Sequence, residues 1–274
     1  MLTFDDLQNM DGVLERGLLC SAYVTRYFTE VLGQEEMLME FEKAFYPYLQ
    51  EGKKRYAGRK YEPDKQGKSL IDKGIDCKGI ETERSDTLPL VKQMLRDILH
   101  ELMERMDETK ALHAFELHMQ RLCSDEVPFD MYIMKKTLSS KVMLKTTSIV
   151  QAKVNADRRA REAGSEASAG EKVEYVIVNG HRNRKTTEMA EDPRFAKANN
   201  LKINRLWYFE HAIIEPVRKI FIGFPNLPIQ HVFRKYKEVL NAKRLCMGTG
   251  LQRFMIHGGR GGGGGGSGGS AGSS

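Results

Sequence analysis

The chain has 274 residues and a formal net charge of +6, with 41% hydrophobic and 29% charged residues. This balance fits a soluble globular protein with one good core or two small ones. No apolar run approaches the eighteen or so residues that span a bilayer, and the first residues, MLTFDD, are acidic where a secretory signal is basic, so we expect an intracellular protein.

The cysteines and histidines form no metal-binding pattern. The four cysteines are far apart and include no Cys-x-x-Cys, so we interpret them as reduced structural thiols. His113 and His118 fall on different sides of an expected helix, which favours surface or packing roles over metal binding.

The first part of the chain predicts a helix followed by a small sheet. Apolar residues recur at three- and four-residue steps over residues 11–32, which indicates a helix with one apolar side that ends at Gly33. After this helix, stretches that mix apolar and polar residues are separated by turn-forming residues. The expected order is a strand at 37–50, a turn at Glu51 and Gly52, a second strand carrying Lys54 and Tyr56, a turn-rich stretch at 64–74, and a strand at 75–80.

The pattern becomes mostly helical from Leu90 onward, with a boundary near residues 87–89. The clearest helix has an apolar stripe over 90–106 and charged residues opposite. The other expected elements are a helix at 111–122, an extended or turning segment at 129–138, a helix at 148–163, a small-residue loop at 164–170, a strand at 173–178, and a buried helix at 205–221 bent at Pro216. Residues 258–274 are almost all Gly and Ser and predict a disordered tail.

One window carries a net charge nearly equal to that of the whole chain. Residues 53–73 contain eight basic and three acidic residues, a net charge of +5. Two lysines beside Arg-Tyr-Ala-Gly offer charges for phosphates, an aromatic ring, and small residues that allow close backbone approach. This pattern predicts a polyanion grip, and nucleic acid is favoured over a membrane surface. A solvated loop is the alternative interpretation.

A series of short motifs carries a family resemblance. The sequences EFEK at 40–43, KKRYAG at 53–58 and KGIE at 78–81, followed by Arg84 and Asp86, resemble the family B DNA polymerases. The later stretches VEYVIVNG, EMAEDP, INRLWY and EPVRKI resemble the thumb of that family in the same order, so the similarity runs from about residue 22 to 220.

The resemblance implies an α+β fold with a small antiparallel palm sheet and flanking helix, followed by a mostly helical thumb with a small β insertion. The corresponding domains are residues 1–87 for the C-terminal part of the palm, 88–257 for the thumb, and 258–274 for the tail.

The resemblance also implies site residues. Lys53, Lys54, Arg55 and Tyr56 match the motif that follows the minor groove and backbone of primer-template DNA, and Lys78 and Arg84 match positions that hold the primer strand. Two departures are Ser85, which stands where the family has a second arginine, and Glu83, which replaces an apolar residue.

One metal-site residue is suggested by the same resemblance. Glu42 matches a palm carboxylate near the metal site, and its alternative reading is a strand glutamate paired to a nearby Lys or Arg. The paired aspartates that hold two divalent ions in template-directed synthesis, Mg²⁺ in the complete enzyme, are absent, so we assign no catalytic residue to this chain.

The resulting expectation is a C-terminal fragment or subunit of a family B DNA-directed DNA polymerase that grips primer-template duplex during replication. An N-terminal polymerase fragment would supply the exonuclease, the fingers that bind dNTP, and the catalytic aspartates. The nucleus or a viral replication site is the expected location. We expect the protein to be a viral or otherwise minimal member of the family. The alternatives are a standalone polymerase-derived DNA-binding protein without catalytic activity and a basic scaffold with no DNA role.

Overall fold

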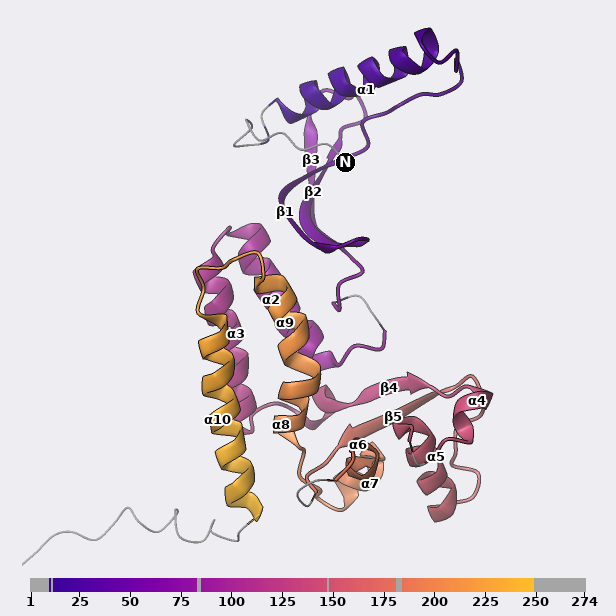
Figure 1. Cartoon of the computed structure of the whole chain (residues 1–274), viewed down its shortest axis with the longest axis vertical. Coiled ribbons are helices and arrows are strands. Elements are labelled where there is room, and N and C mark those ends of the chain that lie inside the picture. Colours follow the sequence, from indigo (N-terminus) through magenta and orange to yellow (C-terminus); the bar gives the residue numbers. More distant parts are fainter. Residues whose placement is uncertain (1–9, 11, 83–84, 147, 181–183, 249–274) are drawn as a thin grey trace, which may run out of the picture.

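The computed structural model describes residues 10, 12–82, 85–146, 148–180 and 184–248, so Arg84 and the expected tail lie outside the described residues. The fold is α+β, as expected, and its described part holds two three-stranded sheets. Figure 1 shows a first sheet beside helix α1, a group of long helices, and a second sheet surrounded by short helices. Within these ranges no helix has both the length and the apolar character for crossing a membrane.

Helix α1 (Val13–Glu30) confirms the first predicted helix. The segment after it runs back along the helix, because the ring of Phe41 lies where a Cβ on Gly17 would be and Met39 N donates to Thr25 Oγ1 at 2.9 Å. These contacts hold the segment against α1. The predicted strand at 37–50 is therefore wrong in its first half, and β1 begins only at Ala44.

The first sheet contains β1 (Ala44–Gly52), β2 (Arg55–Pro63) and β3 (Leu70–Lys78), antiparallel and in that order. β3 begins five residues before the predicted strand at 75–80. The reason is Asp64, whose side chain accepts hydrogen bonds from the backbone N–H groups of Gln66 and Lys68 and from the Ser69 hydroxyl. This compact turn allows the chain to re-enter the sheet at once.

The long helices form the main core. They are α2 (Pro89–Glu104), α3 (Glu108–Ser124), α9 (Ile214–Phe221) and α10 (Ile229–Gly248). α2 begins with proline in its first turn, where the missing N–H removes no helical bond. Its predicted apolar stripe is buried at Leu90, Val91, Met94, Leu95, Ile98, Leu99, Leu102 and Met103. The last predicted member, Met106, lies beyond the end of the helix and is 63% exposed.

Helix α10 is absent from the predicted elements. It packs on α3, where the rings of Phe115 and Phe233 meet edge to face at 5.6 Å and the Tyr236 hydroxyl donates to the Glu116 carbonyl at 3.2 Å. Its buried residues recur at helical spacing, so the signal was present in the sequence.

The second sheet lies between the long helices in sequence, as the predicted β insertion. Its strands are β4 (Met134–Thr137), β5 (Lys172–Ile177) and β6 (Ala190–Glu191), all antiparallel. The short elements around it are the 3₁₀ turn Phe129–Tyr132, α4 (Ser140–Met143), α5 (Val150–Arg161), α6 (Thr186–Met189) and α7 (Pro193–Ala198).

Tyr208 joins this sheet to the helices. It lies in α8 (Arg205–Tyr208), is fully buried, and its hydroxyl donates to Tyr132 O at 2.7 Å and accepts from Ile177 N at 2.9 Å. α8 continues through the π-helical turn Phe209–Ile213 into α9. The helix was predicted to be bent at Pro216, and its irregular turn is found three residues before that proline. A proline lacks the N–H that an α-helix needs at this point, and a π turn is one way to accommodate that loss.

Candidate nucleic-acid interface

The first candidate feature is the turn that connects β1 to β2. Gly52 pairs with Arg55, so Lys53 and Lys54 alone form a two-residue hairpin turn, and both are exposed. The predicted turn at Glu51 and Gly52 and the placement of Lys54 on the second strand are therefore wrong. Lys54 has a φ of 61°, a left-handed conformation that is unfavourable for a lysine and that is held here by the surrounding hairpin.

Lys78 lies beside this turn. It ends β3 and pairs in register with Tyr56 of β2. The next residue, Gly79, has a φ of 67°, and a Cβ there would overlap the carbonyl oxygen of Lys54. Glycine thus allows the β3 end to pass directly against the hairpin turn. The structure brings Lys53, Lys54, Tyr56 and Lys78 together at one end of the sheet.

The ring of Tyr56 belongs to an aromatic cluster on one face of this sheet. Its centroid lies 5.4 Å from that of Phe45 and 5.6 Å from that of Tyr48. Gly58 makes room for this cluster, because a Cβ there would lie 2.9 Å from Phe45 Cδ1. The opposite face, with Ala57 fully buried, packs toward the helices.

Arg55 points to the helix-packed face. Its Nη1 donates to Glu51 Oε1 at 3.3 Å and lies 3.8 Å from Glu81 Oε1, and Lys219 Nζ of α9 approaches the same two oxygens at 3.5 and 3.7 Å. The charge of Arg55 is therefore engaged within the protein. No sequence signal marks Lys219 as a member of this group, because the contact joins parts of the chain that are far apart in sequence.

Glu42 lies just before β1 and not in a strand, so the strand part of its alternative reading is wrong. Its side chain is 79% exposed and Oε1 is 2.8 Å from Lys43 Nζ, which matches the ion-pair part of that reading. The hydrogen bond and charge of Lys43, and the charges of Lys78 and Lys60, lower the pKa of Glu42. Among the described residues, no group of three or more His, Cys, Asp or Glu side chains is placed to hold a metal ion.

Two further lysines lie on the face that carries Tyr56. Lys43 is close enough to Tyr56 and Asp76 for their charges to raise its pKa, after the larger effect of its hydrogen bond to Glu42. The Nζ atom of Lys60 lies 3.0 Å from Glu62 Oε1. The alternation of a strand places residues 56, 58 and 60 on one face, a signal that could have included Lys60 in the predicted interface.

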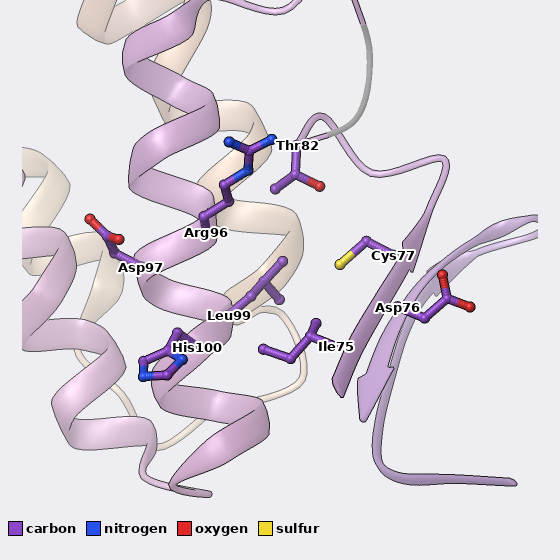
Figure 2. A pocket seen from close by; sticks show the side chains of 8 residues that line it. All are labelled: Ile75, Asp76, Cys77, Thr82, Arg96, Asp97, Leu99 and His100. Carbon is purple, nitrogen blue, oxygen red and sulfur yellow. The ribbon is translucent and has the colours of Figure 1, made fainter. Parts of the chain in front are cut away.

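A cavity of about 550 Å³ lies between β3 and α2 (Figure 2). Arg96 reaches toward Thr82, whose buried hydroxyl has no hydrogen-bond partner in the described structure. Asp97 turns to the other side of the helix, where its Oδ2 lies 2.7 Å from His118 Nε2. The lining also includes Asp76, Cys77 and His100, but Figure 2 shows Asp76 on the far side of β3 from Cys77, so these three side chains do not converge as an acid, a base and a nucleophile would.

The sequence of the chain is similar to that of known proteins. Residues 7–223 match the sequence profile of DNA polymerase family B. The chain is 32% identical over 216 residues to the DNA polymerase delta catalytic subunit of Caenorhabditis elegans, covering 78% of this chain and 19% of that protein. It is 30% identical over 199 residues to the DNA polymerase of Paramecium bursaria Chlorella virus NY2A, covering 71% and 21%.

A solved structure agrees in fold. The family B DNA polymerase of the hyperthermophilic archaeon Pyrobaculum calidifontis superposes with a TM-score of 0.50 at 22% identity, over 73% of this chain and 24% of the other. The chain thus spans about a fifth of the length of the curated relatives named above. Because the family profile covers most of its residues, the chain belongs to family B of the DNA polymerases.

Proposed function

We propose that this chain is the C-terminal palm and thumb portion of a family B DNA polymerase and that it grips the primer-template duplex during DNA synthesis. Residues 1–87 form the end of the palm and residues 88–257 the thumb in this proposal. The observation that carries it is the hairpin turn, which presents Lys53 and Lys54 beside Lys78 and Tyr56 in a chain of this family.

The charges at this end of the sheet suit a phosphate backbone. Within the described part of the chain, Lys53, Lys54 and Lys78 take part in no ion pair, so their ammonium groups are available to phosphates. Lysine and arginine contacts to phosphates supply affinity without reading sequence, which is what a polymerase needs along its product. Holding the duplex keeps the primer end within reach of the incoming nucleotide.

The described residues offer no site for Mg²⁺, because no cluster of metal ligands lies among them and Glu42 is exposed and paired with Lys43. We propose that Mg²⁺ and the dNTP are held by another polypeptide segment that carries the catalytic aspartates, the fingers and the exonuclease. The setting of this reaction is the nucleus or a viral replication site.

Helix α1 offers a surface for that segment. Large apolar side chains are exposed both on this helix and in the segment that follows it. Each of them is 45% exposed or more, and they are Leu18, Leu19, Tyr23, Tyr27, Val31, Leu32, Met37, Leu38 and Met39. Large apolar side chains exposed in this number within one part of the chain mark a candidate interaction site. The matched part of this chain covers only about a fifth of the length of these relatives, so a further polymerase segment is the occupant we propose.

Fluorescence anisotropy with a labelled primer-template duplex tests the DNA grip. We expect the unmodified chain to bind and the double variant Lys53→Ala, Lys54→Ala to bind more weakly. The matched control removes two exposed lysines from the turn at the other end of the sheet, Lys65→Ala with Lys68→Ala. Equal losses in the two double variants would show that net charge alone drives binding, and the proposed grip would fail.

A reconstitution experiment tests the missing segment. The chain is mixed with the N-terminal part of a family B polymerase, and Mg²⁺-dependent primer extension is measured. Extension that requires both polypeptides supports the proposal. DNA binding with no extension from any such mixture supports instead a standalone DNA-binding protein.

A further inference from the structure

Four charged side chains meet where the first sheet contacts helix α9. Glu51 lies at the end of β1, Arg55 begins β2, Glu81 follows β3, and Lys219 comes from α9. The four N–O distances, from Arg55 Nη1 and Lys219 Nζ to the Oε1 atoms of Glu51 and Glu81, lie between 3.3 and 3.8 Å. Each cation therefore serves both carboxylates.

The carboxylates of this cluster are the less accessible members. The side chain of Glu51 is 4% exposed and that of Glu81 15%, against 36% for Arg55 and 32% for Lys219. Glu51 Oε2 is buried and has no hydrogen-bond partner in the described structure. Removing one cation leaves a buried negative charge without compensation, which is more costly than losing a surface ion pair.

The cluster connects two places that matter for the proposed grip. Glu51 and Arg55 lie on either side of the segment 52–54, so the Lys53-Lys54 turn is held at both of its ends. Lys219 belongs to a helix of the other part of the chain. Two carboxylates and two cations are neutral together, so the cluster adds no net charge for attracting DNA.

We propose that Lys219 is a positioning residue that fixes the Lys53-Lys54 turn against α9, and that Arg55 acts in the same cluster and not as a phosphate contact. The affinity part of this inference rests on the proposed DNA grip. The structural part does not, because the turn is held whether or not DNA is present.

Three variants separate positioning from direct contact. Lys219→Met removes the cation and keeps most of the side-chain length. Lys219→Met with Glu81→Gln also removes the carboxylate that lies farther from the remaining cation, because Arg55 Nη1 is 3.8 Å from Glu81 Oε1 and 3.3 Å from Glu51 Oε1. The control Lys237→Met removes the same charge from α10, where Lys237 pairs with Glu210 at 2.8 Å.

Hydrogen exchange of residues 50–56 is the readout that needs no DNA. We expect exchange in the single variant to be about three- to tenfold faster than in the control, and to return close to the unmodified rate in the double variant. Unchanged exchange in the single variant would overturn the inference, as would a double variant that stays as fast as the single one.

Anisotropy with the primer-template duplex supplies the second readout. Weaker binding in Lys219→Met that the Glu81→Gln substitution restores supports positioning. Weaker binding that is not restored, with normal exchange, assigns Lys219 a direct phosphate contact and overturns the inference. If the unmodified chain binds no duplex, the proposed function fails, while the exchange measurements still decide whether Lys219 holds the turn.

Discussion

Replacing Gly79 with alanine tests how the hairpin turn is held. Gly79 has a φ of 67°, and an added Cβ would overlap the Lys54 carbonyl oxygen. The left-handed conformation alone costs about 1–2 kcal/mol for alanine. The overlap involves backbone and adds about 1–3 kcal/mol, or forces the turn to move away.

Gly67→Ala is the matched control. Gly67 has the same φ of 67°, but nothing lies within 4 Å of an added Cβ. The difference between the two variants in the free energy of unfolding therefore isolates the contact with Lys54. We expect Gly79→Ala to be less stable than Gly67→Ala by about 1–3 kcal/mol, a shift of a few degrees in melting temperature.

Urea denaturation followed by circular dichroism measures the stability, and anisotropy with primer-template duplex measures the grip. If the turn relieves the overlap by moving, stability changes less and DNA affinity falls more. Equal stability and equal DNA affinity in the two variants would refute the reasoning, because the close passage of Lys54 over Gly79 would then have no consequence.

Three further measurements follow from the structure. Lys53→Ala with Lys54→Ala should reduce the slope of log affinity against log salt by about 1.8, since each phosphate contact contributes about 0.9; an unchanged slope would exclude contacts at the turn. Tyr208→Phe should lower the free energy of unfolding by about 2–4 kcal/mol in chemical denaturation, because two buried backbone groups lose their hydroxyl partner, and a cost near zero would contradict that bonding. Burial raises the pKa of the Cys123 thiol, so less thiolate forms at a given pH and iodoacetamide near pH 8.5 should label half-buried Cys20 first, whereas equal rates would contradict that burial.

The sequence predicted the parts of the fold that depend on local pattern. The α2 stripe is buried as its spacing indicates, and the helix at 11–32 and the strand at 173–178 are present. The first half of the strand expected at 37–50 is absent because Phe41 packs on Gly17, a tertiary contact that no local pattern reveals. The helix α10 could have been found, since its apolar spacing is regular.

The candidate site was predictable in its residues and less so in its geometry. The resemblance predicted six DNA contacts, and the structure brings four of them, Lys53, Lys54, Tyr56 and Lys78, to one end of the sheet. The fifth, Arg55, is paired with Glu51 and Glu81, and Arg84 lies outside the described residues. The two-residue turn was not expected, because a lysine rarely adopts the left-handed conformation that Lys54 has. Their role in binding DNA stays a prediction.

The π turn at Phe209–Ile213 sets the direction in which Lys219 points. A π turn holds one residue more than an α turn, and each residue of an α-helix rotates the chain by about 100°. Deleting one residue there would let the helix run in continuous α geometry and would swing everything after it by roughly that angle, carrying Lys219 away from Glu51. The single extra residue thus determines which way the side chains of α9 point. A relative that lacks it would need its cation at a neighbouring helix position to reach the same carboxylates.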